Sequence, residues 1–385
     1  MATNNTALNT KEIIKNILVK LSKKERDIIS RRFGLKDADR ETLEAVGKFH
    51  SLTRERIRQI ENATIKKLRE FKELKDGLVE LSAKTAKIIS EHGGLAEREY
   101  LFHLLNTFSP VEYQSDEYEV EKNHYDFILS RLLHEEFEEV SNHDFFKSSY
   151  KLKNEELSHL EEMARELMVR VAELKEVVNT EDAINLLSGT DSYTKHKEKL
   201  TNPSDLEVSS YWSGALFNEN KDLIYSNKAL YSLLQAVRGV EQNKFGYWGL
   251  DESEEISPKT INHKIYLVLK NQGQPMHFTD IAKRINEVCF DHKNANAATV
   301  HNELILDARY VLVGRGIYGL KEWGFKEGVV EDVVLQILKE NGPLTKDEIV
   351  NKVLENRMVK KTTVSLALMN KDVFEKVGEK YQAKA

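Results

Sequence analysis

The stretch Thr42–Leu68, TLEAVGKFHSLTRERIRQIENATIKKL, decides how the first part of the chain folds. Thr53 offers a hydroxyl suited to capping a helix, and Leu52 before it can pack on Ile57 one turn later. These signals predict a helix that begins at Arg54 and follows a shorter helix across a tight turn. The sequence therefore predicts a helix-turn-helix.

The second helix of this pair is predicted to have an apolar and a polar face. At about 100° per residue, its apolar positions gather on one side: Ile57, Ile60, Ile65 and Leu68. The candidate DNA-binding site consists of residues whose polar groups can contact DNA: Thr53, Arg54, Glu55, Arg56, Arg58, Gln59, Asn62 and Lys66. Arginine can donate to guanine, glutamine can bond adenine and glutamate can accept from cytosine. The alternative is an amphipathic face that is merely solvated.

Another helix is predicted just before this pair. Ser22 and Glu25 have the spacing of a capping box, and Gly34 stands where a helix end requires a left-handed residue. These signals place a helix at about residues 23–33.

The segments LSKKERDIISRRFGL, TLEAVGKF and TRERIRQIENATIKKLREF together resemble the fourth domain of housekeeping, sigma-seventy-type sigma factors of bacterial RNA polymerase. The resemblance spans residues 11–71 without a large gap. It implies a domain that binds the upstream element of double-stranded promoter DNA, with another surface on the flap of core RNA polymerase. By position it implies base contacts for Arg54, Glu55 and Gln59. It implies backbone contacts for the following residues: Arg56, Arg58 and Lys66.

Two features depart from the resemblance. His50 lies in the predicted tight turn, where the family usually carries Gly, Asp or Asn, so it either strains the turn or uses the tolerance of His for unusual φ. In addition, only about ten residues precede the domain, and no segment resembles the aromatic-rich sigma domain that melts the promoter. We therefore expect a chain that is not a complete sigma factor.

Composition bounds the remainder of the chain. Its 385 residues predict several domains, and 40% hydrophobic residues suffice for packed cores. No apolar run approaches a membrane span, and the first residues lack the zones of a signal peptide, so a cytoplasmic protein is expected. The single cysteine, Cys289, allows neither an internal disulfide nor a cysteine-based zinc site and is expected to fill a core.

Charge is distributed unevenly, although the formal net charge is only −6. Residues 1–76 contain 19 Lys and Arg against 12 Asp and Glu, whereas residues 77–258 contain 18 against 35. Residues 259–326 contain 10 against 6, and residues 327–385 contain 10 of each. The two basic segments are expected to approach phosphate, and the acidic segment to face either a basic protein surface or solvent.

After the first domain, one order of elements occurs four times. Each repeat shows an amphipathic helix, a second helix with a polar cap, a third helix and two short strand-like runs. This order predicts a mainly α fold with small β-wings, in which a helix-turn-helix domain is followed by tandem winged-helix modules. The predicted domains are 1–76 (helix-turn-helix), 77–154 and 155–256 (acidic winged modules), 257–326 (winged module) and 327–385 (C-terminal winged module). The second acidic module includes residues 190–205, TDSYTKHKEKLTNPSD, which look like an inserted loop.

The segments QPMHFTDI and RYVLVGRGIYGLKEW of the third repeat, within residues 260–325, resemble the HARE-type helix-turn-helix, which is also the folded domain of the RNA polymerase delta subunit. Two closely spaced glycines permit a hairpin that places Arg309 and Arg315 at the wing. These arginines either contact phosphate or are ordinary surface residues. His277 is expected to pack or cap rather than bind a metal, because no second ligand lies at metal spacing.

The fourth repeat looks like a weaker copy of the third. Lys360 and Lys361 stand at the start of its predicted recognition helix, where they can contact a DNA backbone. The module alternatively serves only as a protein-contact cap.

The sequence contains no phosphate-cradling GxxxxGK run, nucleophile elbow or HExxH, so no catalytic residue, metal, cofactor or small-molecule substrate is expected. Two hypotheses remain. The chain is either a sigma-like transcription-initiation factor or an accessory, architectural DNA-binding protein unconnected with polymerase. The first is favoured because the helical segment 11–33 is retained, whereas a generic DNA binder needs only the recognition helix.

Overall fold

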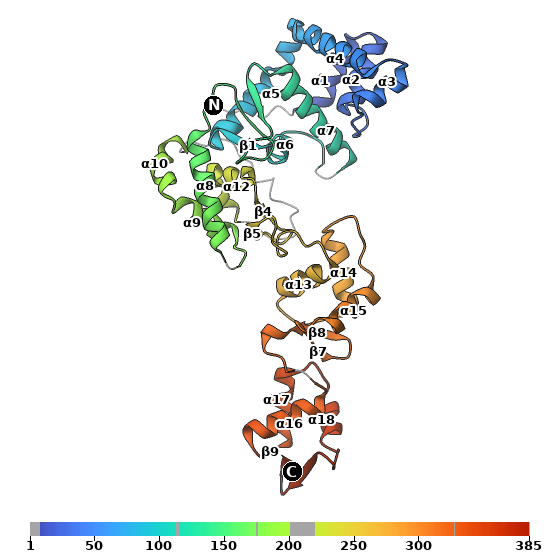
Figure 1. The fold of residues 1–385 in the computed structure, drawn as a ribbon, viewed down its shortest axis with the longest axis vertical. Coiled ribbons are helices and arrows are strands. Elements are labelled where there is room, and N and C mark those ends of the chain that lie inside the picture. Colours follow the sequence, from blue (N-terminus) through green and yellow to red (C-terminus); the bar gives the residue numbers. More distant parts are fainter. Residues whose placement is uncertain (1–7, 113–114, 175, 201–219, 327, 385) are drawn as a thin grey trace. The chain divides into compact units, whose positions relative to one another are not determined.

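The computed structural model describes residues 8–112, 115–174, 176–200, 220–326 and 328–384. Figure 1 shows a mainly helical chain with small antiparallel sheets, which confirms the predicted fold class. The chain divides into two compact units, residues 1–242 with 246–251 and residues 243–245 with 252–385. Among the described helices, none has the length and apolar composition needed to cross a membrane.

The first unit begins with an N-terminal domain of four helices. They are α1 (Thr10–Val19), α2 (Lys23–Phe33), α3 (Leu43–His50) and α4 (Arg54–Arg69). The predicted capping box is confirmed, since the Ser22 hydroxyl accepts from the Glu25 N–H and the Glu25 carboxylate accepts from the Ser22 N–H. Gly34 ends α2 with a φ of 60°, as predicted. The segment 11–33 is therefore two helices separated by a short break.

Two modules follow in the same unit. The first module consists of α5 (Lys72–Glu91), β1 (Leu95–Glu97), α6 (Arg98–Asn106), α7 (Asp116–Phe127), the π-helical turn η1 (Ile128–Leu132), β2 (Phe137–Val140) and β3 (Ser149–Leu152). The second module consists of α8 (Ser158–Glu173), α9 (Thr180–Ser188), α10 (Asp191–Leu200), α11 (Lys221–Ser226), α12 (Lys228–Ala236), β4 (Val240–Gln242) and β5 (Trp248–Leu250). The boundary predicted between residues 76 and 77 falls inside α5, so a continuous helix joins the N-terminal domain to the first module.

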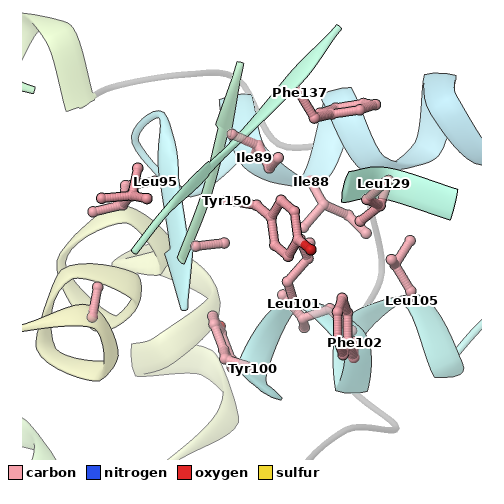
Figure 2. Close-up of a cluster of buried hydrophobic side chains, with 14 of the residues drawn as sticks. Ile88, Ile89, Leu95, Tyr100, Leu101, Phe102, Leu105, Leu129, Phe137 and Tyr150 are labelled. Atoms are coloured by element: carbon pink, nitrogen blue, oxygen red, sulfur yellow. The ribbon is translucent and has the colours of Figure 1, made fainter. Parts of the chain in front are cut away.

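One apolar core runs through the N-terminal domain and both of these modules. Figure 2 shows its centre in the first module, where Ile88 of α5, Phe102 of α6 and Tyr150 of β3 point into one cluster. The Phe102 and Tyr150 ring centroids are 5.9 Å apart. Because the buried side chains of this core come from the N-terminal domain and from both modules, these three parts form one packed body.

The second unit contains two further modules. The third module consists of α13 (Ile261–Gln272), β6 (Met276–His277), α14 (Phe278–Val288), α15 (Ala297–Leu306), β7 (Tyr310–Gly314), β8 (Ile317–Leu320) and the short 3₁₀ helix η3 (Lys321–Trp323). The fourth module consists of α16 (Val330–Asn341), β9 (Leu344–Thr345), α17 (Lys346–Asn356), α18 (Lys361–Ala367), β10 (Phe374–Val377) and β11 (Lys380–Ala383). Each of the two has its own apolar core.

The four modules share a strand arrangement. In the first, third and fourth modules, the strand before the second helix pairs antiparallel with the last strand of the hairpin, giving the orders β1-β3-β2, β6-β8-β7 and β9-β11-β10. In the described residues of the second module the sheet is the hairpin β4-β5, and an antiparallel bridge between Val178 and Trp248 takes the place of the third strand.

Two local predictions are wrong. Cys289 is exposed rather than buried, because it ends α14 in a left-handed conformation with a φ of 54° and its thiol faces the carbonyl of Asp291. The insertion predicted as a loop at residues 190–205 is helical over Asp191–Leu200, where α10 packs on α8. Its last residues, 201–205, lie outside the described residues.

Candidate nucleic-acid interface

The turn between α3 and α4 is tight because of one glycine and one left-handed residue. The Leu52 N–H donates to the Gly47 carbonyl at 2.9 Å, and a β-carbon at Gly47 would lie 2.7 Å from the Leu52 carbonyl oxygen. Ser51, with a φ of 56°, adopts the left-handed conformation. The prediction that His50 occupies the turn is therefore wrong. His50 is the last residue of α3, and its Nε2 lies 2.8 Å from the Asp27 carboxylate.

A small core holds the helix-turn-helix together. Ile28 of α2, Val46 of α3 and Ile57 of α4 are fully buried against one another. Leu52 packs against the same cluster, as the predicted contact with Ile57 requires. The Thr53 hydroxyl accepts from the Arg56 N–H at 3.2 Å and begins α4 at the predicted residue.

The polar face of α4 is exposed. All eight predicted DNA-contacting residues are solvent-exposed: Thr53, Arg54, Glu55, Arg56, Arg58, Gln59, Asn62 and Lys66. On the same helix, the side chains of Ile57, Ile65 and Leu68 are buried. The structure therefore brings the predicted site residues together on one accessible side of α4, between its N-cap, Thr53, and its fourth turn.

Several of these side chains bond to each other in the free protein. The Arg58 guanidinium donates to both carboxylate oxygens of Glu55, at 2.9 and 2.7 Å, and this pairing lowers the pKa of Glu55. Arg56 donates to the Gln59 side-chain oxygen at 3.1 Å. Base contacts by Glu55 or Gln59 must replace these bonds, which exposure to solvent makes weak. The polar face of α4 is therefore already ordered in the free protein, and its internal hydrogen bonds can be exchanged for bonds to bases.

Ion pairs between residues outside the predicted site brace the domain behind this face. Arg32 of α2 pairs with Glu61 of α4 at 2.9 Å. Arg31 pairs with Asp27 at 3.0 Å and with Glu41 at 2.8 Å. The only sequence signal for them is the four-residue spacing of Asp27 and Arg31 on one helix. The other pairs join residues that are distant in sequence.

Comparison with known proteins agrees with this geometry. Residues 17–70 match the family described as Sigma-70, region 4. These residues form a sigma-70 region 4 domain. Over 59 residues the chain is 48% identical to the RNA polymerase sigma factor SigA of Microcystis aeruginosa and to that of Synechocystis sp.; these residues are 15% of this chain and 14% of each relative. SigA of a Bacillus species is 46% identical over 71 residues, 18% of this chain and 19% of that protein.

The chain thus spans less than a fifth of the length of these curated relatives. No solved structure matches the chain. The similarity concerns the region 4 domain and leaves the four modules to be interpreted from their own structure.

The first module covers the side of the region 4 domain that carries its larger core. Phe33 of α2 lies against Phe127 of α7, with ring centroids 4.8 Å apart, and Arg69 of α4 donates to the Arg131 carbonyl at 2.7 Å. Ile65 and Leu68 of α4 are buried in the shared core. The exposed polar face of α4 lies outside this contact.

A partly buried cluster of polar side chains fastens this contact. The Asn123 amide of α7 donates to the carbonyls of Gly34 and Ala38, at 3.2 and 2.8 Å, and its oxygen accepts from Arg40 at 2.7 Å. Arg40 also pairs with Asp126 at 2.6 Å. These contacts connect the segment between α2 and α3 to the helix that follows α6.

The predicted backbone contacts in the second unit differ in accessibility. Arg315 is exposed in the turn between β7 and β8. Arg309 lies at the opposite end of that hairpin, where its guanidinium donates to both carboxylate oxygens of Asp307. Arg309 therefore lies at the base of the β7–β8 hairpin, whereas Arg315 lies at its tip. Lys360 and Lys361 are exposed at the start of α18, as predicted.

The histidine in the third module caps a helix, as predicted. The His277 side chain accepts a hydrogen bond from the Thr279 N–H and so caps the N-terminus of α14. Within the described residues, no group of three or more His, Cys, Asp and Glu side chains is arranged to hold a metal ion.

Proposed function

We propose that the chain is a sequence-specific DNA-binding transcription-initiation factor that acts in the cytoplasm. The carrying observation is a region 4 domain whose α4 exposes the polar face that the sequence predicted. In this proposal Arg54, Glu55 and Gln59 contact bases of the upstream promoter element. The remaining proposed contacts, to the backbone or groove edge, are made by Thr53, Arg56, Arg58, Asn62 and Lys66.

Selection of bound duplexes from a random DNA library tests this proposal. We expect enrichment of a common sequence by the full-length protein and a changed or weakened preference for Arg54→Ala and Gln59→Ala, each costing about 1–3 kcal/mol of discrimination. Gln272→Ala, at an exposed position that ends α13, is the matched control and should select the parent sequence. Equal binding of parent and α4 variants to selected and scrambled duplexes would contradict the assignment.

We further propose that residues 77–154, 155–256, 257–326 and 327–385 are winged-helix modules, of which the third is HARE-like. Support comes from the shared order of helices and the strand pairing described above. In such modules the third helix is the usual DNA-contacting element. Whether that helix is free then distinguishes the roles of the modules.

In each of the first two modules the helix that precedes the hairpin is engaged in protein contacts; it is α7 in the first module and, after the additional helices α10 and α11, α12 in the second. The α7 side chains of Asn123 and Asp126 bind the region 4 domain. In α12, Ser232 is fully buried and donates to the Leu95 carbonyl of the first module at 2.7 Å, and Lys228 pairs with the buried Glu91 at 3.2 Å. Both modules are acidic as well. We propose that they support the region 4 domain and do not contact DNA.

The third helices of the last two modules are accessible, but they differ in chemistry. α15 carries no lysine or arginine and exposes Ile305 and Leu306, which favours protein over DNA as its partner. α18 begins with the exposed Lys360 and Lys361, which can approach phosphates together with Arg315 of the third module. Arg309 is less suited to this role, because Asp307 already neutralises it.

Core RNA polymerase is the proposed protein partner, with the flap as the proposed contact. Similarity of residues 17–70 to SigA proteins supports this, and it also favours a factor without catalytic activity. Co-purification of tagged full-length protein with core polymerase from the native host is the test. Recovery of promoter DNA without polymerase would instead favour an accessory DNA-binding protein, the alternative that the tandem modules leave open.

A further inference from the structure

A groove lies where the region 4 domain meets the first module. Its volume is about 610 Å³, which is within the roughly 300–1,000 Å³ of sites that bind ligands. α1 forms one wall and α7 another, and the apolar lining consists of Ile14, Leu18, Val19, Leu35, Val111 and Val120. Because Val111 and Val120 belong to the first module, the groove exists only when that module is packed on the region 4 domain.

The groove has the character of a surface that a protein segment would cover. Ile14 and Leu18 line the hollow one helical turn apart on α1 but are only 2% and 6% exposed, whereas Val19 beside them is 63% exposed. Val120 lines the hollow from α7. An apolar strip along a helix, flanked by a second helix, is the geometry in which an amphipathic helix inserts its own apolar face.

The charges around the groove are mostly positive. Its cationic lining residues are Lys11, Lys15, Arg26 and Lys36, against the carboxylates of Glu117 and Glu121. Arg26 donates to the carbonyls of Leu18 in α1 and Leu21 after it, and Lys11 pairs with Glu117 at 3.6 Å. Lys15 and Lys36 are exposed, and neither forms an ion pair within the described part of the chain. Two cations thus remain free at the rim.

Glu121 does not offset these cations at the surface. It is buried, it accepts from the hydroxyls of Thr10, Ser109 and Tyr125, and burial raises the pKa of its carboxyl. The Glu121 carboxylate at the polar end of the groove therefore already has hydrogen-bond partners within the protein, and the exposed rim keeps an excess of positive charge.

We propose that this groove binds an amphipathic helical segment of a partner protein, whose apolar side chains fill the hollow and whose acidic side chains pair with Lys15 and Lys36. Charge complementarity selects acidic flanks. The apolar lining distinguishes the occupant from nucleic acid, whose phosphates would leave the exposed Val19 and the half-buried Val111 and Val120 uncovered. Binding here does not require α4 to bind DNA, so failure of the proposed promoter contact leaves it unaffected.

Fluorescence anisotropy with the full-length protein tests the proposal. The probe is a labelled helical peptide of about 16 residues with leucines at helical spacing and glutamates on both flanks. A second peptide carries lysines in place of the glutamates. We expect saturable binding of the acidic peptide and binding of the basic peptide about tenfold or more weaker. Equal binding of the two peptides, or binding of neither, would overturn the proposal.

Substitutions locate the site. The double variant K15E/K36E should bind the acidic peptide about tenfold more weakly than the parent does, with an affinity close to that of the parent for the basic peptide. K339E/K346E makes the same change in net charge at exposed positions of the second unit and should leave binding unchanged. Val120→Phe, which fills the groove, should also weaken binding, with helix content by circular dichroism as the folding control. Undiminished binding by K15E/K36E, or displacement of the peptide by mixed-sequence duplex DNA, would refute the assignment.

Discussion

Replacing Asn123 with alanine should loosen the contact between the region 4 domain and the module that supports it. The side chain is only 7% exposed and makes three hydrogen bonds, two to the carbonyls of Gly34 and Ala38 and one from Arg40. A neutral hydrogen bond contributes about 1 kcal/mol net, and one to a charged group about 1.5–3 kcal/mol. Simple addition would therefore exceed 3 kcal/mol, but not all of this is lost.

Solvent reduces the expected cost. Ala38 and Arg40 are exposed, so water can replace the bonds they lose, and Arg40 keeps its pair with Asp126 at 2.6 Å. Gly34 is buried, and its carbonyl has no such replacement. An unsatisfied buried acceptor costs about 1–3 kcal/mol. We therefore expect Asn123→Ala to lower the free energy of unfolding of the first unit by about 2 kcal/mol.

Urea unfolding followed by circular dichroism measures this change, and hydrogen exchange locates it. Amides of residues 35–41 should exchange faster in Asn123→Ala, while those of the helix-turn-helix core around Val46 keep their protection. Asn185→Ala, at an exposed asparagine of α9, is the matched control and should stay within about 0.5 kcal/mol of the parent. A change below that limit for Asn123→Ala, with exchange at residues 35–41 unaltered, would refute the reasoning. If polymerase needs the covered face of the region 4 domain, the same variant should also recover more polymerase on co-purification.

Three further predictions concern other parts of the chain. Although alanine normally favours a helix, Gly47→Ala should destabilise the helix-turn-helix and reduce DNA binding, because the alanine β-carbon would lie 2.7 Å from the Leu52 carbonyl oxygen. Thermal unfolding measures the stability, and fluorescence anisotropy with the selected duplex measures the binding. A variant more stable than the parent would contradict this prediction. His92 is fully buried, and desolvation lowers its pKa to about 4, so the unfolded chain binds the additional proton between about pH 6.5 and pH 4. The free energy of unfolding should therefore fall as the pH falls through this window, with His92 contributing up to about 3 kcal/mol of the loss. If the urea midpoints of the parent and of His92→Phe depend on pH in the same way, His92 is not the cause of the loss. Arg357 is buried and donates to the carbonyls of Leu312 and Gly328, so Arg357→Ala should loosen the third module from the fourth and increase proteolysis near residue 328, whereas unchanged cleavage would argue against that role.

Local signals in the sequence were enough to predict the elements of the candidate site. The Thr53 cap, the Ser22–Glu25 capping box and the left-handed Gly34 all act within a few residues, and each is confirmed. The same holds for the spacing that places Gln59 on the side of α4 opposite the buried Ile57. Such features are encoded over one or two helical turns, so the sequence alone determined the fold class and the polar face of α4.

Only the tertiary structure decided which surfaces remain available. The α7 sequence, DEYEVEKNHYDF, suggests an acidic solvated helix, yet Asn123, His124 and Asp126 are buried against a segment more than eighty residues earlier in the chain. Cys289 and Ser51 were missed for a related reason, because the residue that takes a left-handed φ depends on how the following segment packs. Burial depends on partners distant in sequence, so the exposure of α4 and the engagement of α7 follow from packing and not from either segment's own sequence.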